Sequence, residues 1–408
     1  MPDSRRPLRV FVYEPYPLGK IFGNLRTLLY ILQFAPADSV HCVVAVPFET
    51  ELANHARTLG ADWMVLAPPD AINRYGGKVL RDSLMGRVRA AAGMIGYNLR
   101  VRRVLRDQQI DVVYCSSIRA LLTVGFGAKL AGVPCVWYVK SKLENGLLDR
   151  LGFWMADRIH FFCEANRDER YPLLVRWFKR KIDVVHIGLD LRDVDLTETH
   201  GSSLDDELQR RGGPAIGYVG QLYAPKGIHF LVEAFARVAP QFPDATLYLM
   251  GDPGIPEYAP YIGDLRERIR ACGLESRVVF TGWRTDVLAI VNRMTVLVHP
   301  SLAEGFGRAV LEAMALGKPV IASRVGGLRE AIRDEENGFL VAPGDVDAIA
   351  DRLRRLLGDP ELRMRIGARA RATVRAEFQV EDKMRQLFSI WRDVARRSPP
   401  ARAEAGAW

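Results

Sequence analysis

Cysteine is scarce in this chain of 408 residues, and its few copies do not cluster. The five cysteines are odd in number, scattered and without a CxxC pair: Cys42, Cys115, Cys135, Cys163 and Cys272. A disulfide framework or a zinc cluster needs cysteines in pairs at short spacing. The sequence therefore predicts a protein of a reducing compartment, the cytoplasm, with no metal cluster.

Long uncharged runs are also missing, with one exception that has the length of a membrane span. The basic start MPDSRRPLR leads into LRVFVY, which is strand-length and not a secretory apolar core. Residues 121–139 are nearly uncharged, but Lys129 lies in the middle and Gly132, Val133 and Pro134 interrupt the run. We expect a buried helix, a turn and a strand there.

Patterns that suggest a metal or a dinucleotide occur only in unsuitable settings. Neither Asp-x-Asp pair, at 193–195 or 345–347, has the expected setting at the end of an apolar strand that leads to a binding site, and Asp345 is better explained as a helix N-cap. The Gly-Phe-Gly at 125–127 lies inside a helical run rather than at a strand-to-helix turn. The seven histidines lack ligand spacing, so His299 is interpreted as a strand-end residue. We predict no metal and no cofactor.

What the chain has in excess is positive charge, a net +9 to which arginine contributes most. Such an excess suits a partner that carries phosphates: a nucleic acid, an anionic membrane or a phosphorylated ligand. The length is natural for two domains, and an apolar fraction of 49% suits an α/β protein.

Short apolar strands alternate with helix-length segments along the chain. This alternation predicts parallel sheets with helices on both faces and ligand sites at the carboxyl ends of the strands. In the first half we expect strands at Leu8–Tyr13, Val40–Val46, Asp62–Leu66, Val112–Cys115, Pro134–Val139, Arg158–Phe162 and Asp183–Ile187. In the second half we expect Pro214–Val219, Ala245–Met250, Arg277–Phe280, Thr295–His299, Pro319–Ala322 and Gly338–Val341. The polar stretch 195–213 is interpreted as the linker between the two halves.

The stretch VHPSLAEGFGRAVLEAMA, which begins at Val298, has the strongest chemical pattern. Glu304 and Glu312 are eight positions apart, so on a helix both lie on roughly the same side. Glycines at the helix start admit a group close to the backbone, and first-turn N–H groups bind anions. A carboxylate beside an anion site is explained if it binds hydroxyls next to a phosphate, as on a ribose or a hexose. The alternative is a strand-turn-helix unit with a solvated glutamate.

This stretch resembles the donor-site signature of glycosyltransferase family 4. The resemblance includes PSLAEGFGRAVLEAMALGKPVIAS, GYVGQLYAPKGIHFLVEAF and VGGLREAIRDEENGFLVAPGD; it is strong over 214–345 and weak before residue 110. It implies an α/β protein of the GT-B fold, with two Rossmann-like domains whose parallel sheets face a central cleft. Residues 1–195 would form the acceptor-side domain, with a C-terminal helix at about 380–397 crossing back onto it. Residues 205–378 would bind the nucleotide sugar.

The function that the resemblance implies is that of a retaining, metal-independent glycosyltransferase. It would move a sugar from a nucleotide-diphosphate sugar to a glycan or lipid-linked acceptor in polysaccharide or glycoconjugate synthesis, without a nucleic-acid partner. Three alternatives remain: a soluble disaccharide-type synthase, a sugar-nucleotide epimerase on the same fold, and an idle relative that serves as a partner subunit.

The resemblance also implies roles for residues of the second domain. Lys226, at a helix start, would contact the donor pyrophosphate and would be catalytic together with Glu304, which would bind hydroxyls of the donor sugar. Glu312 would bind the ribose. The family usually has arginine at the position of Gln221, so Lys226 would be the main cation. The further donor-binding residues would be Gly220, Gln221, Gly251, Gly282, Gly305, Phe306, Gly307 and Arg308.

The first domain departs from the family pattern at two places. Family members usually carry adjacent glycines after the first strand, whereas this chain has Gly19 and Gly23. Many carry a histidine at the end of the fifth strand, where this chain has Tyr138, Val139 and Lys140. We expect Gly23 and Lys140 on the acceptor or phosphate side. An ordinary loop and a solvated surface lysine are the alternatives.

Residues 78–106 are strongly basic and periodic, with eight Lys or Arg and one acid, Asp82. One interpretation is a helix packed on the first domain with arginines as its solvated face. The other is that its basic face lies on an anionic membrane, with the protein peripheral at the inner face. Apolar residues recur at helical spacing: Leu80, Leu84, Val88, Ala91, Ile95 and Leu99. Met85, Met94, Val101 and Val104 widen this stripe.

Overall fold

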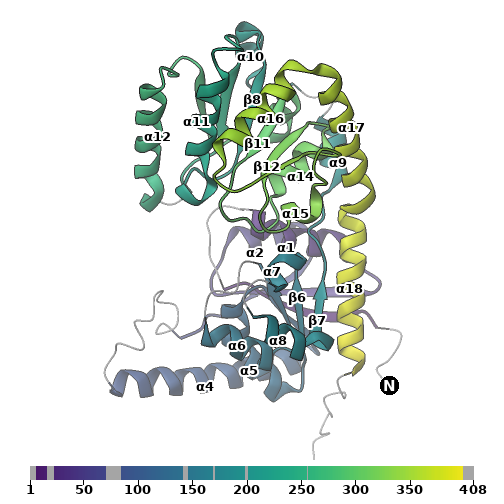
Figure 1. Ribbon diagram of the computed structural model, residues 1–408. Coiled ribbons are helices and arrows are strands. Elements are labelled where there is room, and N and C mark those ends of the chain that lie inside the picture. Colours follow the sequence, from purple (N-terminus) through teal and green to yellow (C-terminus); the bar gives the residue numbers. More distant parts are fainter. Residues whose placement is uncertain are drawn as a thin grey trace, which may run out of the picture. The chain divides into compact units, whose positions relative to one another are not determined.

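The computed structural model describes residues 6–15, 23–69, 84–140, 146–168, 171–197, 201–254 and 256–397. The chain forms two compact units, both visible in Figure 1. Unit 1 comprises Met1–Phe162, Asn166–His186 and Glu381–Trp408. Unit 2 comprises Cys163–Ala165 and Ile187–Val380.

Unit 1 is built on a parallel sheet of seven strands in the order β3-β2-β1-β4-β5-β6-β7. Its central strands are apolar runs buried on both faces, because helices cover both sides of the sheet. The strand order reverses between β1 and β4. The connections after these two strands therefore run in opposite directions along the sheet, which is the place where open α/β sheets bind ligands. The strands are β1 (Leu8–Tyr13), β2 (Val40–Val46), β3 (Asp62–Val65), β4 (Val112–Cys115), β5 (Cys135–Val139), β6 (Arg158–Phe161) and β7 (Ile182–Val184).

Helices cover both faces of this sheet. On one face the core joins Phe11, Val113 and Trp137 of the strands to Leu121 of α5 and Phe153 of α6. The helical elements up to residue 181 are α1 (Gly23–Phe34), α2 (Glu51–Thr58), α4 (Leu84–Asp107), α5 (Ile118–Ala131), α6 (Leu147–Met155), α7 (Glu164–Asp168), α8 (Pro172–Trp177) and the 3-10 turn η2 (Lys179–Lys181).

The last helix, α18 (Val380–Arg397), belongs to unit 1 apart from its first residue. Trp391 is fully buried and packs edge-on against Tyr114 of β4, with ring centroids 5.1 Å apart. Phe388 lies beside Trp391 and is also buried. Two large buried aromatic side chains thus hold the C-terminal helix to the sheet of unit 1.

The nearly uncharged run 121–139 consists of most of α5, a turn and β5, as the sequence predicts. Ser117 caps α5 by accepting the N–H of Ala120, and Gly132 ends it with a left-handed φ of 74°. The run is uncharged because α5 is buried in the core of unit 1. Among the helices that the structure describes, none is long and apolar enough to cross a membrane.

Helices α4 and α5 approach each other closely. Asn98 accepts the N–H of Gly127 through Oδ1 at 2.6 Å, and a Cβ at Gly127 would lie 2.7 Å from the Asn98 carbonyl oxygen. Glycine is therefore required at this crossing. The face of α4 that packs inward carries Tyr97, Val101 and Leu105, all buried. The stripe predicted from the spacing is centred elsewhere: its members Ala91, Ile95 and Leu99 are exposed, whereas Val101, expected only to widen it, is buried.

Unit 2 is built on a parallel sheet of six strands in the order β10-β9-β8-β11-β12-β13. The described strands of both units start and end within three residues of the predicted bounds. In unit 2 the order reverses between β8 and β11. The strands are β8 (Ala215–Val219), β9 (Thr246–Met250), β10 (Val278–Gly282), β11 (Val296–His299), β12 (Val320–Ser323) and β13 (Phe339–Val341).

The helices of unit 2 cover its sheet and bury one large apolar cluster centred on α11 and α16. A 3-10 turn, η3, stands just before α11 and carries Lys226. The helical elements are α9 (Leu191–Thr197), α10 (Asp205–Arg211), η3 (Ala224–Lys226), α11 (Ile228–Val238), η4 (Pro256–Tyr258), α12 (Ala259–Ala271), α13 (Val287–Arg293), α14 (Arg308–Ala315), α15 (Leu328–Ala331), α16 (Val346–Gly358) and α17 (Pro360–Glu377).

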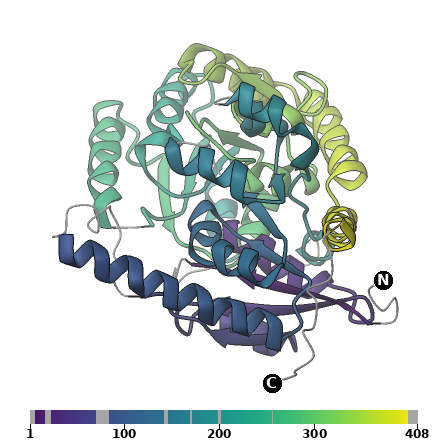
Figure 2. The same cartoon turned by 90° about the horizontal axis from the view of Figure 1, so that it is seen from below.

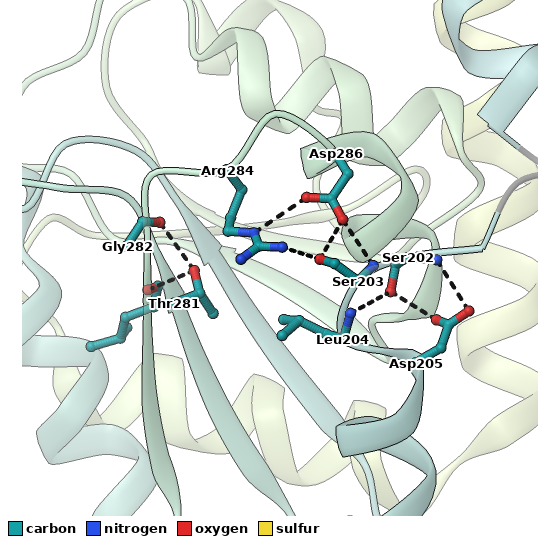
Figure 3. A network of polar contacts seen from close by, with 9 residues as sticks. Ser202, Ser203, Leu204, Asp205, Thr281, Gly282, Arg284 and Asp286 are labelled. Atoms are coloured by element: carbon teal, nitrogen blue, oxygen red, sulfur yellow. Dashed lines mark hydrogen bonds and ion pairs between the residues drawn. The ribbon is translucent and has the colours of Figure 1, made fainter.

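The stretch 195–213, interpreted from its polar composition as a linker, is largely folded structure of unit 2. It contains the end of α9 and all of α10, and its serines are hydrogen-bonded. Ser203 donates to Asp286 Oδ2 from its N–H at 2.9 Å and from Oγ at 2.5 Å (Figure 3). Among the described residues of this stretch, Ser202 and Ser203 thus pair with Asp205 and Asp286, within unit 2. The boundary between the units falls after His186 and not at residue 195.

The two Asp-x-Asp pairs have structural roles. Asp345 caps α16 by accepting the N–H of Ala348 at 2.9 Å, which confirms the predicted N-cap. Asp193 and Asp195 lie in α9, and Asp195 pairs with Arg375. Within the described residues, no group of three or more His, Cys, Asp or Glu side chains is placed to hold a metal ion.

Candidate functional site

Two loops of unit 2 meet at the carboxyl ends of β8 and β11: the loop after β8, which carries Lys226, and the loop after β11, which carries Glu304. These strands are neighbours at the point where the strand order reverses, the place at which open α/β sheets bind ligands. Leu302 donates its N–H to the carbonyl of Pro225 at 2.9 Å, which joins the loops. Gly227 has a left-handed φ of +66°, and a Cβ there would lie 2.1 Å from the Pro300 oxygen. Only glycine at 227 lets the loops come this close.

Glu304 lies just ahead of the helix that carries Glu312, so the prediction that their eight-residue spacing puts both on one side of a helix is wrong. Helix α14 begins at Arg308, and Glu304 belongs to the loop before it. Gly307 at the N-cap has a φ of +75°, and a Cβ there would lie 2.6 Å from Leu328 Cδ2. This turn places Glu304 ahead of the helix, while Glu312 is half-buried in the second turn of α14. Helical spacing therefore does not relate the two carboxylates.

The Glu304 carboxylate is the centre of a polar cluster formed by both loops. Its Oε2 accepts hydrogen bonds from Lys226 Nζ at 2.6 Å, from His299 Nε2 at 2.8 Å and from Ser301 Oγ at 3.4 Å. Its Oε1 accepts the N–H of Gly305 at 3.0 Å. The side chains of Glu304 and Lys226 are only 13% and 15% exposed. A charge-assisted pair that is shielded from water in this way is strong and well ordered.

The surroundings of Glu304 fix its charge. Burial by itself would raise the pKa of this carboxyl, but the hydrogen bond from His299 and the positive charge of Lys226 outweigh burial. The pKa therefore lies well below its usual range, and Glu304 is ionised at neutral pH. Because a carboxylate only accepts hydrogen bonds, Nε2 of His299 is the donor in their contact.

The start of α14, expected to offer N–H groups to an anion, is partly engaged by Glu304 itself. The N–H of Gly305 points to the Glu304 carboxylate. Phe306 is buried with its ring 5.6 Å from that of Phe378, and Arg308 donates from Nη1 to the Gly188 carbonyl at 3.2 Å. Phe306 and Arg308 therefore anchor the loop within unit 2. A ligand anion at Gly305 has to compete with the carboxylate.

Three of the expected donor-site glycines form one contact at the carboxyl ends of β8, β9 and β10. Gly251 donates its N–H to the Gly282 carbonyl at 3.0 Å, and a Cβ at Gly251 would lie 1.9 Å from the Gly220 oxygen. Gly220 and Gly251 have φ values of +152° and +146°, which favour glycine. Gln221 accepts a hydrogen bond from Tyr218 Oη at its carbonyl, 2.9 Å away.

The loop after β10 is held by a network of polar contacts (Figure 3). Arg284 donates from Nε to Asp286 Oδ1 at 3.2 Å and also contacts Ser203. Thr281 Oγ1 donates to the Gly282 carbonyl at 3.1 Å. Arg284 therefore stabilises the loop, and Trp283 beside it is 46% exposed.

In unit 1, Lys140 is not a solvated surface lysine. It follows β5, and its Nζ pairs with Glu14 Oε2 at 2.9 Å; the two side chains are 15% and 2% exposed. Glu14 follows β1, at the edge where the sequence predicts ligand-binding loops, but the sequence analysis did not select it. Gly23 is the first residue of α1, and Gly19 lies outside the described residues.

Two further residues of unit 2 belong to the site although the sequence pattern gives them no chemical role. His299 is interpreted from the sequence only as a strand-end residue, and Ser301 is not singled out. Both contact Glu304, and His299 and Ser301 also contact each other at 3.1 Å. Their position in the sequence could have identified them as site residues, because His299 ends β11 and Ser301 lies between that strand and Glu304.

Comparison with solved structures shows the fold. Anabaena HepE, solved with UDP and glucose, has a TM-score of 0.75 at 21% identity, covering 94% of this chain and 98% of HepE. Sucrose-phosphate synthase of Thermosynechococcus elongatus has a TM-score of 0.73 at 20% identity, covering 96% of this chain and 100% of the synthase. The two Rossmann-like units thus have the GT-B glycosyltransferase fold.

Sequence comparison gives the family. Residues 213–359 match the model described as glycosyl transferases group 1. Alpha-D-kanosaminyltransferase of Streptomyces kanamyceticus is 31% identical over 65% of this chain and 72% of the relative. The 2-deoxystreptamine glucosyltransferase of the same organism is 33% identical over 64% of this chain and 71% of the relative. The chain belongs to the group 1 glycosyltransferases and is a transferase of sugars.

Proposed function

We propose that this glycosyltransferase takes a sugar from a nucleotide-diphosphate sugar bound by unit 2 and transfers it to a glycan or lipid-linked acceptor on the side of unit 1. The observation that carries the proposal is the shielded cluster of Glu304, Lys226 and His299 at the switch point of unit 2. A site of this kind has a cation for phosphates and a fixed carboxylate for hydroxyls.

The proposed reaction begins with an exchange of partners at Lys226. The ammonium group lies 2.6 Å from the Glu304 carboxylate in the structure. A donor diphosphate at the start of α14 would compete for this ammonium group and for the N–H of Gly305. Lys226 would then neutralise the leaving diphosphate, while Glu304, still held by His299, would bind hydroxyls of the sugar.

The remaining donor-site assignments rest on the family resemblance, and the positions of these residues support them. Gly305, Phe306 and Gly307 form the turn that leads into α14, whose first residue is Arg308 and whose N-terminal end favours an anion. Glu312, in the second turn, would bind the ribose. The loops with Gly220, Gln221, Gly251 and Gly282 lie along the same edge of the sheet and would surround the nucleotide.

Retention of anomeric configuration, metal independence and membership of family 4 are part of the proposal. They rest on the resemblance of the Glu304-x7-Glu312 stretch to that family. The physical support for metal independence is that Lys226 and the helix start supply positive potential where a metal ion otherwise would.

The nature of the acceptor is supported by relatives. One is named a lipopolysaccharide core biosynthesis mannosyltransferase of Rhizobium leguminosarum, 28% identical over 63% of this chain. Another is an Escherichia coli galactosyltransferase whose named substrate is a diphosphoundecaprenol-linked sugar, 26% identical over 64% of this chain. We therefore propose polysaccharide or glycoconjugate synthesis. The five cysteines are all free, which suits the cytoplasm.

A donor panel tests the proposal. Purified protein is incubated with UDP-, GDP- and other nucleotide-linked hexoses, with and without lipid-linked and soluble sugar acceptors, and the products are identified by mass spectrometry. A glycosylated acceptor with one donor supports the proposal. An epimerised sugar nucleotide formed from donor alone supports the epimerase. If no donor binds or reacts, an idle partner subunit becomes the better explanation.

Glu312→Gln is expected to raise the donor KM about tenfold and to leave kcat nearly unchanged. The change removes a charged acceptor for the ribose, which is far from the bond that breaks, and such a contact contributes about 1.5–3 kcal/mol. Initial rates over a range of donor concentration measure both constants. Glu361→Gln, on the exposed surface of α17, is the control. A fall in kcat as large as that of Glu304→Gln would contradict the ribose assignment.

A further inference from the structure

We propose that unit 1 docks on an anionic lipid bilayer through the outward surface of α4, α5, α6 and α8, here called the basic-apolar face. Ten of the eighteen large hydrophobic side chains that are exposed among the described residues lie on these four helices. A concentration of this kind marks an interaction surface. The ten are Ile95, Leu99, Phe126, Leu130, Leu147, Leu148, Leu151, Trp154, Leu173 and Trp177.

The exposed apolar residues form outward stripes on each helix. Ile95 and Leu99 are four positions apart on α4, Phe126 and Leu130 on α5, and Leu173 and Trp177 on α8, while α6 has Leu147, Leu151 and Trp154. Residues at this spacing lie on one side of a helix. Each helix therefore has an inner apolar side that packs and a second apolar side that does not.

The four helices lie next to one another in unit 1 (Figure 1), and α4 is the long helix at the lower left when the protein is seen from below (Figure 2). Helix α4 crosses α5 at Gly127, and α5 meets α6 where Gly125 lies against Met155. The ring of Trp154 on α6 packs edge-on against Phe178, the residue after α8, with centroids 5.0 Å apart. The apolar stripes therefore belong to one surface.

Positive charge accompanies the apolar stripes. The described side chains of α4, α5, α6, α8 and η2 include one exposed acid, Asp107, and nine exposed basic residues. Exposed tryptophan and leucine beside arginine and lysine are typical of surfaces that lie at the boundary of lipid headgroups and acyl chains. The basic residues are Arg89, Arg100, Arg103, Arg106, Lys129, Arg150, Arg176, Lys179 and Arg180.

The charge favours a bilayer over a second copy of this chain. In a symmetric dimer the same surface patch faces itself, so these basic residues would meet their own copies. Like charges at an interface disfavour association. An anionic bilayer pairs the cations with headgroup phosphates and accepts the tryptophan and leucine side chains at the same time.

Co-sedimentation of the full chain with vesicles tests this proposal, without donor or acceptor. We expect binding to vesicles of phosphatidylcholine with phosphatidylglycerol, little binding to phosphatidylcholine alone, and loss of binding as salt rises. One variant joins Leu173→Gln and Trp177→Gln, whose parent side chains are 72% and 77% exposed. It is expected to lose most binding and to fold normally.

A second variant joins Arg100→Gln, Arg103→Gln, Arg150→Gln and Arg176→Gln. Each basic residue near an anionic surface contributes about a fivefold gain in binding, so this variant is expected to bind about a hundredfold or more weakly. The controls change similarly exposed residues of α17 in unit 2, Met364→Gln and Arg365→Gln with Arg369→Gln. They are expected to bind like the parent.

The proposal is overturned if the parent does not bind anionic vesicles at low salt, or if both variants bind as it does. It is also overturned if the parent forms a dimer that the Leu173/Trp177 variant cannot form and no vesicle binding is seen, since a second copy would then cover the face. Donor turnover with a soluble acceptor is measured in parallel. Because the basic-apolar face does not include the donor site, failure of one proposal leaves the other intact.

Discussion

Lys226→Ala is expected to lower kcat/KM for the donor about ten- to a hundredfold while the chain remains folded. The lysine has a fixed place: η3 lies against the loop after β11, and Nζ reaches the Glu304 carboxylate. In the proposed complex this ammonium group contacts the leaving diphosphate. Loss of a charge-assisted contact costs about 1.5–3 kcal/mol, which corresponds to that range of rates.

The measurement is steady-state kinetics with the best donor, together with circular dichroism and thermal unfolding. Arg369→Ala, which removes an exposed cation from α17, separates a local effect from the loss of one net charge. Lys226→Arg keeps the charge but alters the geometry, so it should fall between parent and alanine variant. If Lys226→Ala has the same kinetic constants as the parent with every donor that reacts, Lys226 does not contact the leaving diphosphate.

Glu304→Gln is expected to have the largest effect, a fall in kcat of about a hundredfold or more. A preorganised charge that faces the reacting group contributes on this scale, and the amide has neither the charge nor the same acceptors. The amide also leaves Lys226 without its anionic partner in a shielded place. Turnover should therefore fall far more than the circular dichroism spectrum changes.

The same variant has a pH signature. The pKa of Glu304 is depressed in the folded chain, so its ionised form adds stability above the pKa of the unfolded chain, about 4.3. This contribution is lost as the pH falls through the folded pKa. The difference in free energy of unfolding between parent and Glu304→Gln should thus be greatest above about pH 4.3 and should shrink in stronger acid. If this difference in free energy of unfolding stays constant as the pH falls below about 4.3, the pKa of Glu304 is not depressed by Lys226 and His299.

Local sequence was sufficient to predict the strands of this fold. Strands in a covered parallel sheet are short apolar runs, and this pattern is visible without tertiary information. The N-cap of α16 at Asp345 was predicted in the same way, because a cap bonds within three residues of itself. The loops at the carboxyl ends of strands, and with them Lys226 and Glu304, followed from this alternation and from the family resemblance.

Packing between helices could not be predicted in the same way. Apolar residues occur on two sides of α4, Ile95 and Leu99 on one and Tyr97 and Val101 on the other, and the spacing favoured the first as the packed side. The close crossing at Gly127 and Asn98 buries the second side and leaves the first exposed. Periodicity shows that a helix has an apolar side, but only the neighbouring helix decides which of two such sides is covered.

The sequence by itself determined which residue types stand at the ends of which strands; tertiary structure decided which of them meet. Lys226 and Glu304 are 78 positions apart and touch because β8 lies beside β11 in the sheet. Lys140 and Glu14 are 126 positions apart and are paired at the carboxyl end of the other sheet. Strand order results from the packing of the whole unit, and no local pattern encodes it. The ionised, shielded state of Glu304 depends on that order, because its partners come from two strands that are distant in the chain.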